Sequence, residues 1–157
     1  MSRATIQASI VSKLRAVTGV ENVYAGPFRV EDLQAVVDKL QDSDNVVLQY
    51  WTIRRVRSIP EGGRLRGTTS CQTTYIHTWE LTCWMGYREN VSEDRLQNLI
   101  DDVLTNLMDD RTWDGAGWGS ELPISLDAIR DEPAFGVYGT RASFTINVAT
   151  VHAVTNT

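Results

Sequence analysis

The sequence contains little of what catalytic and metal sites are usually built from. Its 157 residues include only two cysteines and two histidines, and Lys13 and Lys39 are its only lysines. No apolar run approaches the roughly 20 residues of a membrane-spanning helix. No continuous apolar stretch follows Arg3, as a signal peptide would require. We therefore expect no membrane association and residence in a cytoplasm, where the sequon Asn90-Val-Ser92 stays unmodified.

A surplus of positive charge is also missing. The formal charge is −5, whereas a dedicated nucleic-acid-binding domain is normally basic. The charge is nevertheless uneven, because residues 54–66 hold five arginines against the single acid Glu61. That segment carries +4 and leaves −9 for the rest of the chain. A small basic patch on an acidic body favours self-association through complementary surfaces at least as much as contact with DNA.

The composition and length fit one folded domain. Hydrophobic residues make up 42% of the chain and charged residues 22%, which is typical of globular proteins. A chain of this length can bury a core of its own. Since no repeat, linker or low-complexity segment interrupts it, we treat residues 1–157 as a single domain.

Hydrophobic periodicity predicts both helices and strands. Apolar residues recur at helical spacing in residues 6–17, 31–41 and 92–108, and Ser92 is a good N-cap for the last of these. Segments rich in β-forming residues predict strands at 20–25, 46–59, 68–87, 124–130, 134–138 and 141–153. The predicted fold class is α+β: a mostly antiparallel sheet with a long β-hairpin and two to three helices packed on one face.

The hairpin, at about residues 46–87, is the largest predicted feature. Its turn is marked by Pro60-Glu-Gly-Gly63. In its second strand the odd-numbered residues from Cys71 to Tyr87 share one face, and the other face is mostly Ser, Gln, Thr and Glu. The strands exceed the usual five or six residues. We therefore expect the far end, where the arginines cluster, to project beyond the core.

Cys71, His77 and Cys83 suggest a metal site, but the strand geometry excludes one. Twelve extended residues at about 3.3 Å each place the two sulfurs roughly 40 Å apart. Neither a disulfide between them nor a shared zinc ion fits that distance. We expect both cysteines to be free thiols without bound metal.

The glycine-rich segment with Gly115, Gly117 and Gly119 resembles a phosphate-binding loop only superficially. A dinucleotide-binding loop follows a strand and opens a helix, whereas this segment follows a predicted helix. We expect a flexible or partner-ordered loop, in which Trp113 and Trp118 would serve as interface anchors.

Other arrangements that could support catalysis are incomplete. The acidic pairs at 101–102 and 109–110 have no lysine beside them on a strand, as a metal-dependent nuclease would need. His77 and His152 have no nucleophile at a recognisable spacing, and the G-x-S-x-G motif does not occur. We predict no enzyme activity, no cofactor and no metal.

The clustered arginines admit three interpretations: a solvated hairpin tip, salt-bridge partners across a subunit boundary, or DNA contacts. We favour the subunit boundary, because arginine suits bidentate pairing with carboxylates. The candidate interface residues are Arg54, Arg55, Arg57, Arg64, Arg66, Trp113 and Trp118. Acidic counterparts for the arginines are Glu31, Asp32, Asp42, Asp44, Asp109 and Asp110.

Four features occur in a recognisable order: an N-terminal helix, a long strand pair ending in Trp79-Glu-Leu-Thr-Cys-Trp-Met-Gly-Tyr87, a helix beginning Ser92-Glu-Asp-Arg-Leu96, and a closing strand pair. Together they resemble the tail-terminator (tail-completion) proteins of long-tailed phages and phage-derived particles. The resemblance covers nearly the whole chain. It lies in the order of the elements and the general character of their sequences, without a short diagnostic motif. The helix at 31–41 is not a feature that the family requires.

The resemblance implies a structural virion protein that is made in the host cytoplasm and assembles at the tail–head junction. It implies a ring, typically a hexamer, that caps the tail tube, ends tail polymerisation and presents the surface for head joining. The implied partners are other copies of the chain, the tail tube protein and head–tail connector or neck proteins, with DNA only in passage through the ring. The alternative is a neck or head-completion connector protein, since such proteins have related folds and similar sizes.

Overall fold

The computed structural model describes residues 3–26, 47–66, 70–87, 93–109, 112–113, 116–118, 124–133 and 138–155. The predicted helix at 31–41 and the predicted strand at 134–138, except for Tyr138, lie outside these residues. Within the strands and helices, several side chains are also outside the description. They are those of residues 47–48, 62–66, 70–72, 87, 93, 109, 112–113, 116–118 and 153–155.

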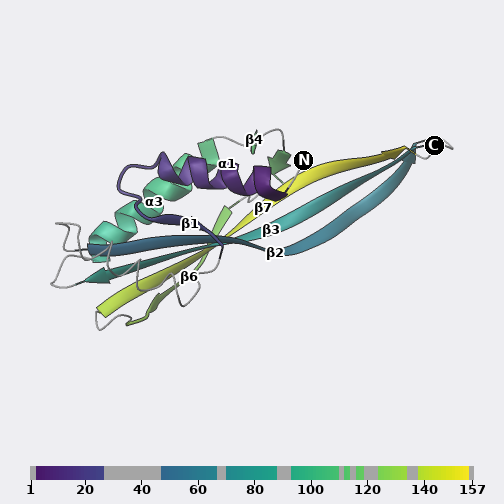
Figure 1. Ribbon diagram of the computed structural model, residues 1–157. Helices are drawn as coiled ribbons and strands as arrows, with labels where there is room; N and C mark the ends of the chain where they lie inside the picture. The colour runs from purple at the N-terminus through teal and green to yellow at the C-terminus, as the bar shows by residue number, and fades with distance from the viewer. Residues whose placement is uncertain are drawn as a thin grey trace.

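A seven-stranded sheet forms the centre of the described structure (Figure 1). Its order is β1-β2-β3-β7-β5-β4, with β6 also paired to β7. The β1–β2 pair is parallel and the others are antiparallel. The predicted α+β class, with a mostly antiparallel sheet, is confirmed. The strands are β1 Val23–Ala25, β2 Val47–Arg66, β3 Ser70–Tyr87, β4 Thr112–Trp113, β5 Ala116–Trp118, β6 Ile124–Asp131 and β7 Tyr138–Thr155.

Two helices, α1 (Arg3–Arg15) and α3 (Glu93–Asp109), cover one face of the sheet (Figure 1). Each forms because its apolar residues recur at helical spacing and give a stripe that the sheet buries. α1 lies over β1 and β2, and α3 lies beside it toward β6. Gly19, at φ +91°, lets the chain turn after α1. The buried core side chains of the helices are Ile6, Ile10 and Leu14 from α1 and Leu96, Leu99, Ile100, Val103 and Leu107 from α3.

The two strands of the predicted hairpin are confirmed, since β2 and β3 pair from Val47↔Tyr87 to Arg66↔Ser70. The predicted turn at residues 60–63 is wrong, because these residues lie inside β2 opposite residues 73–75 and the strand continues to Arg66. The projecting element is larger than a hairpin, however. β7 pairs with β3 over its full length, from Tyr138↔Tyr87 to Thr155↔Ser70, and therefore extends beyond the predicted 141–153. Figure 1 shows β2, β3 and β7 continuing together past the helices. We call this three-stranded extension, residues 54–66, 70–78 and 147–155, the arm.

The face of the sheet opposite the helices is not uniformly polar, because Trp84 is buried on it. Its indole lies over Gly86 and Gly139, where an added Cβ atom would come within 2.5 Å of ring atoms at either position. The indole N–H donates to the Glu132 carbonyl at 2.8 Å, and the Tyr50 ring stacks on it at 5.6 Å. Two glycines on neighbouring strands thus leave room for one large ring.

Gly139→Ala tests this arrangement. We expect a loss of about 1–3 kcal/mol in unfolding free energy, because the new methyl group overlaps the Trp84 ring. In a Trp84→Ala background the same substitution should cost almost nothing, since nothing then occupies that space. Denaturant unfolding of the four proteins measures the difference. An equal cost in both backgrounds would show that the indole is not what excludes a side chain at Gly139.

Candidate functional site

The first three arginines lie where β2 leaves the body and enters the arm. A β-bulge falls between Arg55, which pairs with Trp79, and Arg57, which pairs with Thr78. The extra residue is Val56, whose side chain is 50% exposed. Because one inserted residue reverses the alternation, Arg55 shares a face with the helices while Arg57 lies on the open face. All three arginine side chains are exposed.

Arg54 already has a partner in its own chain. It lies opposite Glu80 on the open face, and its Nε donates to the Glu80 carboxylate at 2.6 Å. The pair is partly exposed, with 59% of the Arg54 side chain accessible, so it contributes only about 0–1 kcal/mol to stability. Among the described residues, Arg55 and Arg57 form no ion pair.

The remaining candidate residues are described only in backbone. Arg64 and Arg66 pair with Gln72 and Ser70 at the far end of the arm, so the five arginines spread along the arm instead of gathering at its tip. Their side chains lie outside the described residues, as do those of Trp113 and Trp118. Of the acidic counterparts named above, none has a described side chain.

The expectation of a loop around the two tryptophans is wrong. Trp113 belongs to β4 and Trp118 to β5, which pair with each other. β5 then pairs with β7 through Gly117↔Ala149 and Trp118↔Val148. This small hairpin extends the sheet beside the base of the arm.

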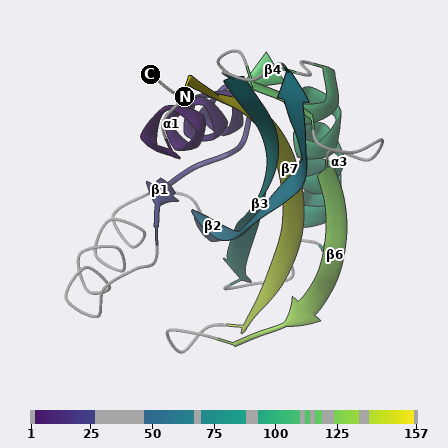
Figure 2. The ribbon, with the colours of Figure 1, turned by 90° about the vertical axis from the view of Figure 1, so that its right-hand side faces the viewer.

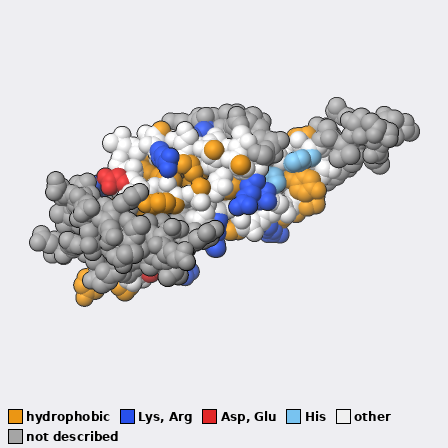
Figure 3. Space-filling model, in the orientation of Figure 1, with side chains coloured by type: hydrophobic (Ala, Val, Ile, Leu, Met, Phe, Trp, Pro, Cys, Tyr) orange, Lys and Arg blue, Asp and Glu red, His pale blue; other side chains and the backbone are white. Residues whose placement is uncertain are grey.

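A hydrogen-bonded network centred on His77 joins the three arm strands. His77 is 8% exposed, and its Nδ1 lies 2.8 Å from the Ser58 hydroxyl of β2. Its Nε2 lies 2.8 Å from the Thr150 hydroxyl of β7, which is also 3.1 Å from His152 Nε2. The ring of Tyr75 stacks on His77 and contacts His152 edge-on. Figure 3 shows exposed histidine surface on the arm, next to an apolar patch.

This network is suited to stability more than to catalysis. A serine–histidine pair that activates a nucleophile has a carboxylate on the second imidazole nitrogen, and here the hydroxyl of Thr150 takes that place. Burial lowers the pKa of His77, and the positive charge of Arg55 and the nearby His152 lower it further. The imidazole is therefore held neutral, as a packed link between strands.

The positions of Cys71 and Cys83 agree with the single extended strand that the sequence predicted. β3 is continuous from Ser70 to Tyr87, so Cys71 and Cys83 lie on one extended strand, although the Cys71 side chain is not described. Cys83 is a fully buried free thiol whose pKa is raised by burial. Within the described part of the chain, no three His, Cys, Asp or Glu residues gather as a metal site would require.

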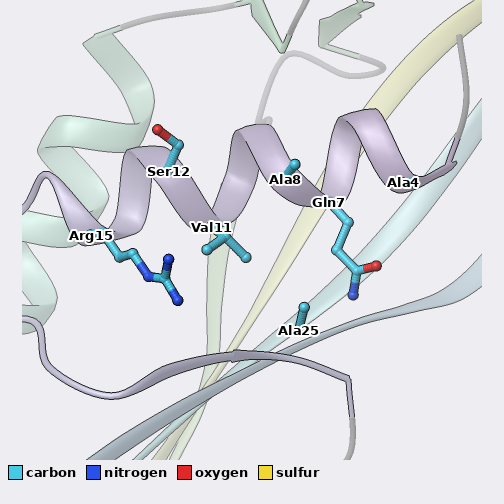
Figure 4. A pocket seen from close by; sticks show the side chains of 7 residues that line it. All are labelled: Ala4, Gln7, Ala8, Val11, Ser12, Arg15 and Ala25. Carbon is cyan, nitrogen blue, oxygen red and sulfur yellow. The ribbon is translucent and has the colours of Figure 1, made fainter.

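An open groove of about 460 Å³ runs between α1 and β1 (Figure 4). Its polar side chains hold the helix to the edge of the sheet. Gln7 donates to the Ile53 carbonyl at 3.2 Å, and Arg15 donates to the Val23 carbonyl at 3.1 Å. The rest of the lining is small, from Ala4, Ala8, Ser12 and Ala25, with Val11 between them. These residues provide no acid, base or nucleophile arrangement.

The outer side of α3 carries an acidic stripe. Asp94, Asp101 and Asp102 are all exposed, and Met108 is 44% exposed in the last turn. The last turn contains no basic residue, so no side chain within α3 offsets the partial negative charge at its C-terminus. Among the described helices, none has the length and apolarity needed to cross a membrane.

Comparisons with known proteins add no assignment. No family model matches the chain, and no curated protein sequence matches it. One solved structure with some likeness is the type 4 fimbrial biogenesis protein PilO from Pseudomonas aeruginosa, at 8% identity over 97% of this chain and 85% of that chain. Its TM-score of 0.18 is too low to bear on fold or function.

The neutral state of His77 makes stability depend on pH. Its pKa is lower in the folded protein than the usual value of about 6.5 in an unfolded chain. Below that pH the unfolded chain takes up a proton that the folded protein resists, so this contribution to stability is lost as the pH falls. Wild type should therefore lose more unfolding free energy than His77→Gln between about pH 7.5 and about pH 5.5. Parallel slopes in urea titrations of the two proteins would contradict this.

Cys83 should be unreactive in the native protein. In a Cys71→Ser variant it is the only thiol, and its burial and raised pKa keep it from forming the reactive thiolate. A chromogenic disulfide reagent should label no thiol before denaturant is added and one thiol afterwards. Rapid labelling of the folded variant would show that the body opens locally around β3.

Proposed function

We propose that this chain is a structural subunit that assembles with copies of itself into a ring, and that the ring caps the tail tube of a phage or phage-derived particle. The observation that carries the proposal is the arm. Its strands run for 18 to 20 residues, whereas strands of five or six are usual. Its length is not explained by the helix-covered core, which ends before it (Figure 1).

The exposed residues of the arm favour contact with another protein. Val56, Ile59 and Val151 are 50%, 37% and 57% exposed, and Arg55 and Arg57 lie on either side of Val56. Apolar side chains bordered by arginine are typical of protein interfaces. The acidic remainder of the chain supplies complementary charge, which supports self-association over binding to nucleic acid.

The proposed mechanism is geometric. A contact between two different surfaces of successive copies closes into a ring if the rotation per copy divides a full turn. Such a ring has two chemically different faces. One would match a layer of the tail tube, while the other would not accept a further layer and would be available to the head connector. On this proposal the protein acts at the tail–head junction of the virion, without enzyme activity or cofactor.

Charge reversal in the arm tests the proposal. Arg55→Glu/Arg57→Glu should leave the monomer folded, because exposed substitutions usually change stability by less than about 0.5 kcal/mol. Assembly should weaken by roughly 2–5 kcal/mol if the arginines pair with partly desolvated carboxylates of a neighbour. Capped tails should become scarce, and over-long or headless tails should accumulate in electron micrographs.

The matched control is Arg3→Glu/Arg130→Glu, which makes the same change in net charge at exposed residues outside the arm. It should leave tails capped. Normal tail length and head joining with a defect only in DNA passage would instead favour arginine contacts with DNA. Normal particles from the arm variant would mean that these arginines are solvated and take no part in assembly.

A further inference from the structure

We propose that the arm of one copy docks on the exposed side of α3 in the next copy, through the residues around the β2 bulge. This inference rests on the proposed function, in that it names the two surfaces that the ring would join. We call the first surface the bulge patch. It consists of Arg55, Val56, Arg57 and Ile59.

The bulge patch lies on an edge of the sheet that is not paired in the described residues. β1 follows the outer edge of β2 only from Trp51 to Ile53, and the Gly26 N–H then donates to the Ile53 carbonyl. Beyond that point the described structure places no strand beside β2. An edge of this kind can either pair with another strand or make contacts through its side chains.

The edge is built against strand pairing. Register shifts interrupt it between Arg55 and Arg57 and again between Glu61 and Gly63, and Pro60 lies between them. Bulges, charged residues and proline are the devices that prevent one sheet edge from adding to another. This edge therefore makes its contact through side chains. They are those of Arg55 and Arg57, with the exposed Val56 between them and the exposed Ile59 two residues further on.

The exposed side of α3 complements the side chains of the bulge patch in charge and apolar character. Asp94, Asp101 and Asp102 provide three carboxylates beside one exposed arginine, Arg95. They face the guanidinium groups of Arg55 and Arg57, which form no ion pair within the described residues, and the exposed Met108 provides an apolar contact. Asp94 and Asp101 are two helical turns apart, or about 10 Å. Arg55 and Arg57 leave the β2 edge on opposite faces, so their long side chains can each reach one of the two carboxylates. The C-terminal end of α3 adds further attraction for positive charge.

The two surfaces lie at different places on one copy, so the same contact can repeat from copy to copy around a ring. The bulge patch is on β2, the strand that β1 borders, whereas α3 packs toward β6, and Figure 2 shows β1 and α3 to the left and right of the central strands. A copy whose arm docks on α3 of its neighbour leaves its own α3 available to the next arm. Because the two surfaces differ, the contact is head to tail and can close on itself.

Mixing two charge-reversed proteins tests this pairing. The first is Arg55→Glu/Arg57→Glu, and the second is Asp101→Arg/Asp102→Arg. Each alone places like charges across every contact, so self-association should fall by about tenfold or more. In an equimolar mixture, both contacts become complementary again when the two proteins alternate. Native mass spectrometry and sedimentation velocity should then show oligomers that contain equal numbers of each.

Several outcomes would overturn the inference. One is an α3 variant that assembles like wild type while the arm variant does not, which would leave the proposed ring intact with a different docking surface. Failure of the mixture to recover association, with both variants folded by circular dichroism, would also exclude the pairing. If the reversed α3 does not fold, Asp94→Asn/Asp101→Asn/Asp102→Asn replaces it and should weaken wild-type arm docking.

A control separates the inference from the proposed function. Two variants, Cys71→Ser/Arg57→Cys and Cys71→Ser/Asp101→Cys, are mixed and treated with a short bismaleimide crosslinker. A crosslinked pair supports arm-to-α3 docking even where free subunits associate weakly, and its absence at the highest soluble concentration contradicts it. A virion that lacks a ring of this chain would instead refute the proposed function, whatever the crosslinking shows.

Discussion

The central strand β3 is hydrogen-bonded on both sides over its whole length, and the rest of the structure depends on this pairing. β2 follows one edge and β7 the other, so every arm residue of β3 has a partner strand on each side. In the body, the helices cover one face of these strands and supply the buried core. In the arm, neither described helix covers the strands. There the backbone hydrogen bonds between strands contribute a larger share of the stability than they do in the body.

The side chains of β3 mark where that change occurs. Trp79, Leu81, Cys83 and Met85 are fully buried under the helices. His77, next along the same face, is still largely buried but is held by hydroxyl groups of both neighbouring strands. These hydrogen bonds lie where the apolar core ends. They can hold the three strands in register at a point that no described helix covers. A rigid arm costs less entropy to dock than a flexible one.

Sequence periodicity predicted the individual helices and strands. It could not predict features that depend on pairing between segments far apart in the chain. The apolar stripes located α1 and α3, and alternation located the β2–β3 hairpin, because both signals lie within one segment. The third strand of the arm could not be placed, since Ser70 pairs with Thr155 at the far end of the chain. Trp84 was missed for the same reason: the space that it fills is left by Gly86 and Gly139, on two strands whose register no local pattern reveals. The arginine cluster was visible in the sequence, but not its division between two faces, because nothing in residues 54–57 signals a bulge.

The bulge at Val56 links the internal network to the proposed docking surface. With strict alternation, Arg57 would fall on the same face as Arg55 and add positive charge near His77, whose pKa burial already lowers. Ser58 would then turn to the open face and leave the Nδ1 of His77 without its partner. The inserted residue instead brings Ser58 opposite His77 and turns Arg57 outward. The same backbone irregularity thus satisfies a buried histidine and separates two arginines around an exposed valine, so the arm cannot lose its bulge without changing both its stability and its surface.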